Sequence, residues 1–334
     1  MSTSTQDSSG AQECPVCSAD SAGPAAIGPD GYCETCGRKV PVGRDHAELD
    51  LGPVAGVTDR GLRHQRNEDA MALATASGPL GPVALAVVSD GVSSAPRPDE
   101  ASLMAVRTAM RLLLKSARTG EDPAGASAAA AKAGARALSE LVGPEGAPAA
   151  TYVSAVATAE VLTVCWLGDS RAYWLAADPA DCVRLTRDDS LAEEIVAAGL
   201  ASVDEAMSSP QAHVITRWLG ADLPEPQPHV AQFAPPGPGV LLICSDGLWN
   251  YRPEAADLAA LALPAALTDP LGAAAAMVKF AIESGGIDNI TAVLIPFPLN
   301  ADRADNADRA DHSPTEPSVI TASENPPGET GTAR

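Results

Sequence analysis

Two apolar segments of this sequence end in the same tripeptide, Ser-Asp-Gly, and this repeat constrains how the chain can fold. The segment "VALAVVSDG" places Asp90 after a run of aliphatic residues, and "VLLICSDG" places Asp246 in the same position. Short runs of β-branched and aliphatic residues predict strands buried on both faces. One Asp-Gly is also a common turn signal. Its recurrence after two buried strands, where an uncompensated carboxylate is costly, predicts two carboxylates that face one site.

The order of predicted strands and helices favours antiparallel sheets covered by helices. From about residue 53 to 297, strand-like runs follow one another directly and helix-like segments come in pairs, which is not typical of a parallel βαβ array. Further strands are predicted at 151–158, 161–168, 170–176 and 288–297, and helices at 99–117, 122–142 and 269–284. Aromatic residues make up only 3%, so the core must consist mainly of Val, Leu, Ile and Ala.

Length and charge exclude several classes of protein. The 334 residues suit one large domain or one domain with appendages, and the formal net charge of -21 disfavours binding to nucleic acid or to anionic membranes. The N-terminal "MSTSTQDSSG" has no secretory pattern, and no run reaches the roughly 18–20 apolar residues of a membrane helix. We therefore expect a cytoplasmic protein with no nucleic-acid or membrane partner. Its seven cysteines are then expected to be thiols or metal ligands, not disulfides.

Composition divides the chain into five segments. Residues 1–12 are polar and predicted to be disordered, residues 13–40 hold four cysteines, and residues 41–52 read as a linker. Residues 53–297 carry the predicted strands and helices. Residues 298–334 form an acidic tail with a small Ala-Asp-Arg repeat and several prolines. Because the tail has almost no bulky apolar residues, it cannot bury enough surface to fold and is predicted to be disordered.

The four N-terminal cysteines have the spacing C-x2-C-x15-C-x2-C, formed by Cys14, Cys17, Cys33 and Cys36. Each C-x2-C lets two thiolates reach one ion, and four thiolates complete a closed tetrahedral zinc site. Such a site is structural, because all four positions are filled by sulfur, and the metal would supply the folding energy of so short a segment. The segment resembles a zinc ribbon, a module that often serves for docking. A rubredoxin-like iron site and four scattered thiols in a flexible arm are the alternatives.

More acidic residues lie next to other strand-like runs. They are Glu68 and Asp69 in "RNEDA", Asp169 in "WLGDSRAYWL" and Asp288 in "GGIDNITAVLI". Carboxylates that cluster at strand ends would repel one another in a pocket of low dielectric constant. A pair of hard cations removes this cost, and Mg²⁺ or Mn²⁺ prefers such oxygen ligands. One carboxylate can then bridge two ions about 3.5–4 Å apart, with a bridging water or hydroxide as the nucleophile.

Seven segments in this order resemble the metal-dependent protein Ser/Thr phosphatases of type 2C. They are "DRGLRHQRNEDA", "VVSDGVSSAPRPDEAS", "ATYVSAVATAEVLTVCWLGDSRAYWL", "LTRDDSLAEEI", "VITRWLG", "LLICSDGLWNY" and "GGIDNITAVLI". Each segment alone is a weak signal, but seven in order at plausible spacing are specific, and together they cover about residues 53–297. The resemblance implies an α+β fold, a four-layer α-β-β-α sandwich of two antiparallel sheets flanked by helices. It also implies a two-metal site at one end of the sandwich.

The resemblance assigns metal-site roles to individual residues. Asp90 matches the carboxylate that bridges the two Mn²⁺ or Mg²⁺ ions, and Gly91 matches a residue that offers a backbone carbonyl. The other matches are Asp246 and Asp288 as the remaining direct ligands of one metal, Glu68 as an acid that orients metal-bound water, Asp169 as a ligand of a third, weaker metal, and Thr151 as a threonine of the family's Gly-Thr-Thr stretch.

The sequence departs from the family pattern at three places. His64 occupies the position of the arginine that grips the substrate phosphate, and Arg63 and Arg66 flank it. If residues around 63 formed a strand, Arg63 would point to the opposite face. The usual Gly-Gly-His after the first Asp-Gly is replaced by Ser93, Ser94 and Ala95. Asn250 replaces the usual acid after the second Asp-Gly, which predicts a weaker third metal site.

The function that the resemblance implies is that of a protein-serine/threonine phosphatase. A hydroxide held between two Mn²⁺ or Mg²⁺ ions attacks phosphorus in line, without a phosphoenzyme. The candidate catalytic residues are Asp90, Asp246, Asp288, Glu68 and His64. His64 either binds phosphate when protonated or donates the proton to the leaving oxygen. The implied partners are phosphorylated proteins, namely a bacterial-type Ser/Thr kinase or its substrates.

The alternative function belongs to a different class. It is a catalytically weak phosphatase fold that acts as a regulatory or binding module, with the zinc ribbon as its docking surface. The retained metal acids favour the enzyme, whereas His64 and Asn250 favour the alternative. The remaining candidates are interpreted as packing or surface residues, namely His213, His229 and His312, Cys165, Cys182 and Cys244, and Trp166, Trp174, Trp218 and Trp249.

Overall fold

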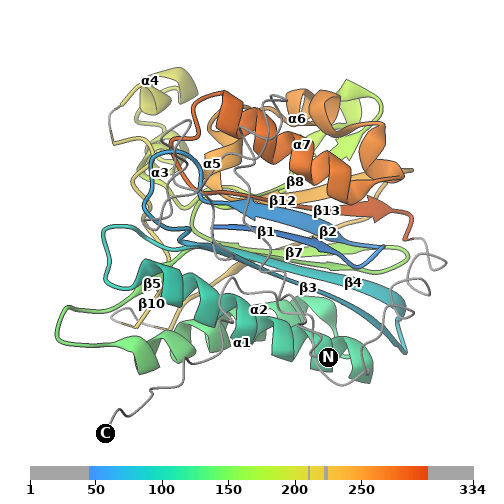
Figure 1. Cartoon of the computed structure of the whole chain (residues 1–334), viewed down its shortest axis with the longest axis horizontal. Coiled ribbons are helices and arrows are strands. Elements are labelled where there is room, and N and C mark those ends of the chain that lie inside the picture. The colour runs from blue at the N-terminus through green and yellow to red at the C-terminus, as the bar shows by residue number, and fades with distance from the viewer. Residues whose placement is uncertain (1–44, 210, 222–224, 300–334) are drawn as a thin grey trace, which may run out of the picture. The chain divides into compact units, whose positions relative to one another are not determined.

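The computed structural model describes residues 45–209, 211–221 and 225–299 (Figure 1). The predicted zinc ribbon at 13–40, the predicted disordered segment at 1–12 and nearly all of the predicted tail lie outside the described residues. No helix within the described ranges is long and apolar enough to cross a membrane.

Two antiparallel sheets form the centre of the fold. The order in the six-stranded sheet is β1 (His46–Asp50), β2 (Ala55–Asp59), β13 (Ile290–Phe297), β12 (Gly239–Cys244), β8 (Arg171–Ala176) and β9 (Val183–Arg184). The order in the five-stranded sheet is β11 (His229–Phe233), β7 (Leu162–Leu167), β6 (Tyr152–Ala157), β4 (Gly81–Asp90) and β3 (Asp69–Gly78). A short pair joins β10 (Leu219–Gly220) to β5 (Ala149–Ala150).

Helices cover the outer face of each sheet. In Figure 1, α1 (Pro98–Thr119) and α2 (Pro123–Leu138) lie below the five-stranded sheet, and α6 (Ala255–Ala262) and α7 (Pro270–Glu283) lie above the six-stranded sheet. The shorter helices are α3 (Leu191–Ala197), α4 (Val203–Met207) and α5 (Asp246–Trp249), with 3₁₀ turns η2 (Ser139–Leu141), η3 (Pro179–Asp181) and η4 (Ala265–Leu267). This confirms the predicted sandwich of two antiparallel sheets flanked by helices.

Three layers of apolar side chains hold the four layers of secondary structure together. The middle layer lies between the sheets and includes Leu73, Trp174 and Ile243. The outer layers pack α1 and α2 against one sheet and α6 and α7 against the other. Each sheet therefore buries both faces, which explains why its central strands read as uninterrupted apolar runs.

Local signals fix the ends of the helices. The side chain of Asp122 accepts the backbone N–H of Gly125 at 2.8 Å, and the side chain of Asp269 accepts that of Gly272 at 2.9 Å. In both helices a proline follows the capping aspartate, where its missing N–H has no cost. The helices predicted at 122–142 and 269–284 therefore begin within one or two residues of their predicted starts.

Some predictions for the elements need correction. The predicted pair formed by 151–158 and 161–168 is confirmed as β6 and β7, and 170–176 forms β8, which joins the other sheet. Residues 46–50, predicted to be linker, form β1 and pair with β2. This strand was missed because it is a short, half-polar edge strand that buries one large apolar side chain, Leu49. The predicted linker therefore ends before residue 46.

Candidate metal centre

The two strands that end in Ser-Asp-Gly belong to different sheets, and their ends meet. Asp90 is the last residue of β4, and Asp246 is the first residue of α5, which follows β12 after a single residue. Burial raises the pKa of both carboxyls well above the usual range. The charge of Asp246 adds to the shift at Asp90, so the two carboxylates lie close enough to repel each other.

Two more of the candidate acids belong to this cluster. Asp169 lies in the turn between β7 and β8, where burial and then the charge of Asp188 raise its pKa to about 7. Asp288 lies two residues before β13, and its charge raises the pKa of Asp90 and of Asp246. The structure thus brings together four acids from four separate segments in one region of low dielectric constant.

Glu68 and His64 lie beside this cluster. Ser93 Oγ donates a hydrogen bond to Glu68 Oε2 at 2.5 Å, so one of the residues that depart from the family pattern supports this acid. His64 Nδ1 lies 3.9 Å from Glu68 Oε2, and His64 Nε2 lies 3.1 Å from Asp288 Oδ1. His64 therefore lies between two of the candidate metal-site acids.

Asp69 is a member of the cluster to which the sequence assigned no role. It lies directly opposite Asp90 in the β3–β4 ladder. Its Oδ2 accepts hydrogen bonds from the hydroxyls of Ser245 and Thr291, both at 2.7 Å. Burial raises its pKa to about 6. The sequence signal was its place next to Glu68, but its role depends on cross-strand pairing that a sequence pattern does not reveal.

The glycine after each strand-end aspartate permits a close approach of backbones. A Cβ atom on Gly247 would lie 1.9 Å from the carbonyl oxygen of Asn289, and one on Gly91 would lie 2.2 Å from that of Pro98. No side chain fits at either position. Glycine follows the aspartate in both places because only a residue without a side chain lets the neighbouring backbone segment come this close.

Two polar side chains fix the backbone around the acids. Thr151 Oγ1 accepts the backbone N–H of Asp90 at 3.0 Å. Asn289 Oδ1 accepts the backbone N–H of Glu68 at 2.7 Å, and its Nδ2 donates to two carbonyls of the loop between β2 and β3 at 2.8 and 3.1 Å. Both residues are buried, so each holds an acid-bearing segment in place without contacting solvent.

The acidic cluster has the chemistry of a divalent cation site. Asp69 Oδ1 and Asp246 Oδ1 are buried oxygens that have no hydrogen-bond partner within the described part of the chain. Mg²⁺ and Mn²⁺ take such carboxylate oxygens as ligands and would offset the charges that raise the pKa values. Among the described residues, no three acidic, histidine or cysteine side chains form a preassembled metal-binding group.

The cysteines of the described residues do not form a competing nucleophilic site. Burial raises the pKa of the Cys165 thiol to about 12, and it raises the pKa of Cys244 as well. A protonated thiol is a poor nucleophile. Cys182 is half-buried, and its Sγ donates to the carbonyl of Ala176 at 3.3 Å. These residues match their interpretation as packing residues.

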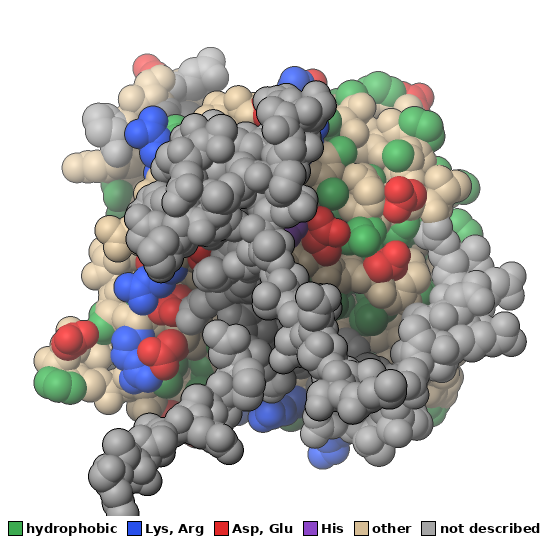
Figure 2. Space-filling model, viewed as in Figure 1, with side chains coloured by type: hydrophobic (Ala, Val, Ile, Leu, Met, Phe, Trp, Pro, Cys, Tyr) green, Lys and Arg blue, Asp and Glu red, His purple; other side chains and the backbone are tan. Residues whose placement is uncertain are grey.

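The arginines near His64 differ in whether their side chains already have a partner or are free to bind a phosphate. Arg60 donates to the carbonyl oxygen of His64 at 2.5 Å, and Arg66 Nε lies 3.7 Å from Glu68 Oε1. Arg63 is exposed and forms no ion pair within the described ranges. It lies in a turn between β2 and β3, so the strand-based reason for pointing Arg63 away from the site is wrong. On the face in view in Figure 2, other basic side chains lie beside acidic ones.

Comparisons with curated proteins identify related phosphatases. The serine/threonine phosphatase stp of Listeria innocua is 34% identical over 147 residues, which are 43% of this chain and 55% of that protein. The serine/threonine protein phosphatase PstP of Mycobacterium tuberculosis is 28% identical over 243 residues, which are 72% of this chain and 44% of that protein. The chain thus spans about half the length of the curated relatives that it matches.

Solved structures and a family model extend the comparison. The crystal structure of the M. tuberculosis phosphatase PstP/Ppp aligns with a TM-score of 0.58 and 26% identity, covering 72% of this chain and 96% of that chain. The catalytic domain of PstP in complex with two manganese ions aligns equally well, with a TM-score of 0.58 and 26% identity over the same shares of both chains. The model for Protein phosphatase 2C matches residues 60–264. Because this match covers more than half of the sequence, the chain belongs to the protein phosphatase 2C family.

Proposed function

We propose that this protein hydrolyses phosphoserine and phosphothreonine in proteins with the help of two Mn²⁺ or Mg²⁺ ions. The observation that carries the proposal is the cluster of Asp90, Asp169, Asp246 and Asp288, in which burial and then neighbouring carboxylate charges raise the pKa of Asp90, Asp169 and Asp246. Divalent cations would offset the repulsion within such a cluster when its carboxyls are ionised. The named relatives are serine/threonine phosphatases, and one solved relative holds two manganese ions, which supports Mn²⁺ as a cofactor here.

In this proposal the metal ligands are those that the resemblance implies. Asp90, Asp246, Asp288 and the Gly91 carbonyl would hold the two ions, and Glu68 would orient water bound to them. When bound, two divalent ions generate a nucleophile from water at neutral pH and offset the charge on the phosphoryl oxygens. The protein positions the carboxylates through the close glycine contacts and the hydrogen bonds of Asn289 and Thr151.

His64 is proposed to act on the phosphate side of the reaction. Its ring lies between Asp288 and Glu68, with Nε2 3.1 Å from Asp288 Oδ1. A protonated ring there can bind a phosphate oxygen or donate a proton to the leaving serine or threonine oxygen. The exposed Arg63 is the nearest cation in sequence without an acidic partner, and it could bind the same phosphate.

Asp169 is proposed as a ligand of a third and weaker metal. Asn250 replaces the acid that usually supports this site, and its Nδ2 donates a hydrogen bond to Asp246 Oδ2 at 3.1 Å. This contact uses one oxygen of Asp246 and supplies no negative charge. It is also the observation that favours the alternative function, a catalytically weak phosphatase fold that regulates or binds a partner.

Mn²⁺-dependent hydrolysis of a phosphopeptide tests the proposal. The Asp246→Asn variant should lose at least about a hundredfold in kcat/KM, because it loses a charged metal ligand. Asp257→Asn changes an exposed aspartate on α6 and is the matched control, for which we expect wild-type activity. A wild-type protein that is inactive with both Mn²⁺ and Mg²⁺ would favour the binding module. Wild-type activity in Asp246→Asn would contradict the metal assignment.

We also propose that residues 13–40 bind one structural zinc ion through Cys14, Cys17, Cys33 and Cys36. These residues lie outside the described part of the chain, so the support is their spacing alone. Elemental analysis should find about one zinc per chain. Removal of residues 1–42 should remove this zinc and leave turnover of a small aryl phosphate unchanged. The truncated protein keeps Asp45, whose Oδ2 lies 3.3 Å from Arg60 Nε in the catalytic domain. Loss of turnover would place the segment in the catalytic domain.

The physiological setting is proposed from the sequence and the family. The substrates would be phosphorylated proteins, either a Ser/Thr kinase or the proteins that it modifies.

A further inference from the structure

Trp249 connects two separate segments of the acidic cluster. It is the last residue of α5, three positions after Asp246, and its side chain is 2% exposed. Its indole Nε1 donates a hydrogen bond to the carbonyl oxygen of Asp169 at 2.9 Å. This bond ties the backbone that carries Asp169, at the β7–β8 turn, to the helix that begins with Asp246.

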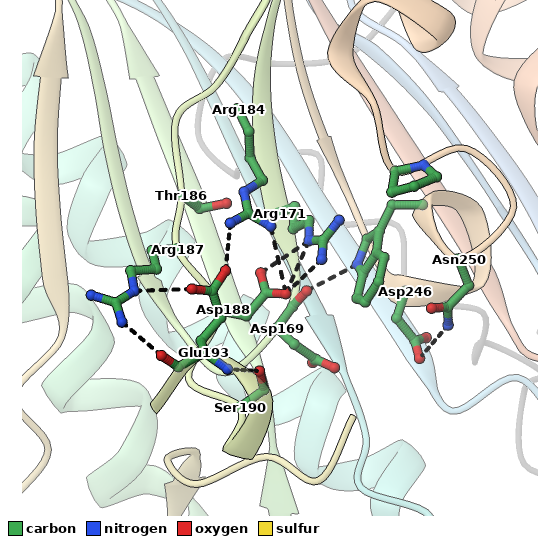
Figure 3. Close-up of polar contacts among 12 residues, drawn as sticks. Asp169, Arg171, Arg184, Thr186, Arg187, Asp188, Ser190, Glu193, Asp246 and Asn250 are labelled. Atoms are coloured by element: carbon green, nitrogen blue, oxygen red, sulfur yellow. Dashed lines mark hydrogen bonds and ion pairs between the residues drawn. The ribbon is translucent and has the colours of Figure 1, made fainter. Parts of the chain in front are cut away.

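A buried arginine holds the indole ring from one face. The guanidinium carbon of Arg171 lies 3.4 Å from the centroid of the Trp249 ring. The same guanidinium donates to Asp188 through Nη2 at 2.6 Å and through Nε at 2.9 Å (Figure 3). Its Nη1 donates to the hydroxyl of Tyr173 at 3.0 Å. With three nitrogens engaged, the guanidinium has one position, and it fixes the plane of the indole.

The buried ion pair between Arg171 and Asp188 is not expected to stabilise the fold by much. Arg171 and Asp188 are both nearly inaccessible, with side chains 3% and 5% exposed. Burying two charges costs desolvation free energy, which their attraction seldom exceeds by much. Apolar residues of similar size would fill the space at lower cost. The specific geometry of the pair therefore points to a positional role.

The segment that supplies Asp188 also grips the Asp169 turn directly. The next residue, Asp189, accepts the backbone N–H of Gly168 on Oδ2 at 3.1 Å, and its own N–H donates to the Gly168 carbonyl at 2.9 Å. The ring of His213, from the segment between α4 and β10, lies 5.9 Å from the Trp249 ring. Contacts therefore surround the turn and the indole on several sides.

We propose that Trp249 and Arg171 are positioning residues that set the separation of Asp169 and Asp246 for metal binding. This inference rests on the proposed two-metal function and deepens it. The two acids repel each other and lie on different segments, so a fixed tie between these segments is needed to keep them at a distance that cations can bridge. The indole N–H provides that tie, and the Arg171–Asp188 pair keeps the indole in place.

The Trp249→Phe variant tests the tie with a minimal change. Phenylalanine keeps an aromatic ring for Arg171 to stack on but removes the N–H that binds the Asp169 carbonyl. The matched control is Trp174→Phe. Trp174 is fully buried between the sheets, and its Nε1 has no hydrogen-bond partner among the residues that the structure describes. Both variants lose similar volume from the protein interior, but only one loses the tie to the metal centre.

Two measurements on the full chain distinguish positioning from packing. Calorimetric titration of Mn²⁺ into metal-free protein should show the weakest site at least about fivefold weaker in Trp249→Phe than in wild type. Hydrogen exchange at residues 165–171 of the metal-free protein should be faster in Trp249→Phe. Trp174→Phe should change neither measurement, even if its Tm falls further. Arg171→Lys, which keeps the charge but loses the flat guanidinium, should resemble Trp249→Phe.

The inference is overturned if Trp249→Phe keeps wild-type Mn²⁺ affinity and wild-type exchange at residues 165–171. It is also overturned if Trp174→Phe weakens Mn²⁺ binding in proportion to its loss of Tm, because the effect would then be general destabilisation. A wild-type protein that binds no Mn²⁺ refutes the proposed function instead. In that case faster exchange in Trp249→Phe alone would still support the tie between the two segments.

Discussion

At the scale of a single residue, His64 occupies a position that the family pattern assigns to phosphate binding, but its neighbours in the structure are acidic. In the family pattern its position belongs to a phosphate-gripping arginine, yet its Nε2 lies 3.1 Å from Asp288 Oδ1 and its Nδ1 lies 3.9 Å from Glu68 Oε2. Acidic neighbours attract a cation, so the pocket accepts a positive charge. A guanidinium at this position would carry that charge at any assay pH.

We therefore expect His64→Arg to lower KM for a phosphopeptide at pH 8 by about three- to tenfold. The gain should appear mainly in KM if the contact is equally strong in the ground and transition states. Steady-state kinetics at saturating Mn²⁺ measures the effect. The control is Arg63→Ala in the wild-type and His64→Arg backgrounds. An unchanged KM in His64→Arg together with a raised KM in Arg63→Ala would assign the phosphate contact to Arg63.

At the scale of elements, the arrangement of the proposed metal site depends on how closely α5 approaches the start of β13. A Cβ atom on Gly247 would lie 1.9 Å from the Asn289 carbonyl oxygen, and Asn289 also holds the loop before β3. One added methyl group must therefore push apart three segments that carry metal-site acids. Overpacking of this kind costs about 1–3 kcal/mol or more, because the interior cannot shift freely.

Gly247→Ala should lower Tm by at least about 4 °C and weaken Mn²⁺ binding by about tenfold or more. Gly143→Ala is the matched control, because a Cβ there would meet no atom within 4 Å and its φ is not in the left-handed region. Differential scanning calorimetry and Mn²⁺ titration of both variants provide the comparison. Equal Tm and equal Mn²⁺ affinity in the two variants would show that the Gly247 approach is not needed.

The elements predicted correctly are those whose sequence signal is local. β4 and β12 read as strands because both faces are buried, and α7 begins at a capping aspartate followed by proline. β11 was missed because it is an edge strand with alternating partly exposed residues, beginning at His229. α3 has only seven residues and too few apolar positions to show a helical period. Short edge elements depend on the neighbours that they pack against.

For the site, too, local sequence signals could be recognised, whereas contacts between distant segments could not. Asp90, Asp246 and Asp288 could be named as candidates because each lies beside a recognisable strand, and the structure brings them into one cluster. The roles that the resemblance implies for them stay predictions. Asp69 received no role because its importance depends on lying opposite Asp90 across a ladder. Trp249 was interpreted as a packing residue because Arg171, which lies over its ring, is distant in sequence. Pairings between distant segments are set by the whole fold, which local patterns do not encode.

At the scale of the whole molecule, the acidic cluster should make stability depend on pH. In an unfolded chain the carboxyls of Asp69 and Asp169 titrate near their ordinary pKa of 3.8, whereas burial raises their pKa to about 6 and about 7 in the folded protein. Between these values the folded state binds more protons than the unfolded state. The free energy of unfolding of metal-free protein therefore falls as pH rises from about 4 to about 7.

We expect the Tm of metal-free protein to fall by at least about 5 °C between pH 5 and pH 8. One unit of pKa shift corresponds to about 1.4 kcal/mol, and 1 kcal/mol to about 2–4 °C in a domain of this size. Mn²⁺ should raise Tm more at pH 8 than at pH 5.5, because binding must displace protons at the lower pH. Asp69→Asn removes one of these groups and should flatten the slope, whereas exposed Asp257→Asn should not. A Tm that stays constant or rises over this range, or equal slopes in the two variants, would mean that the buried carboxyls do not control the stability of the fold.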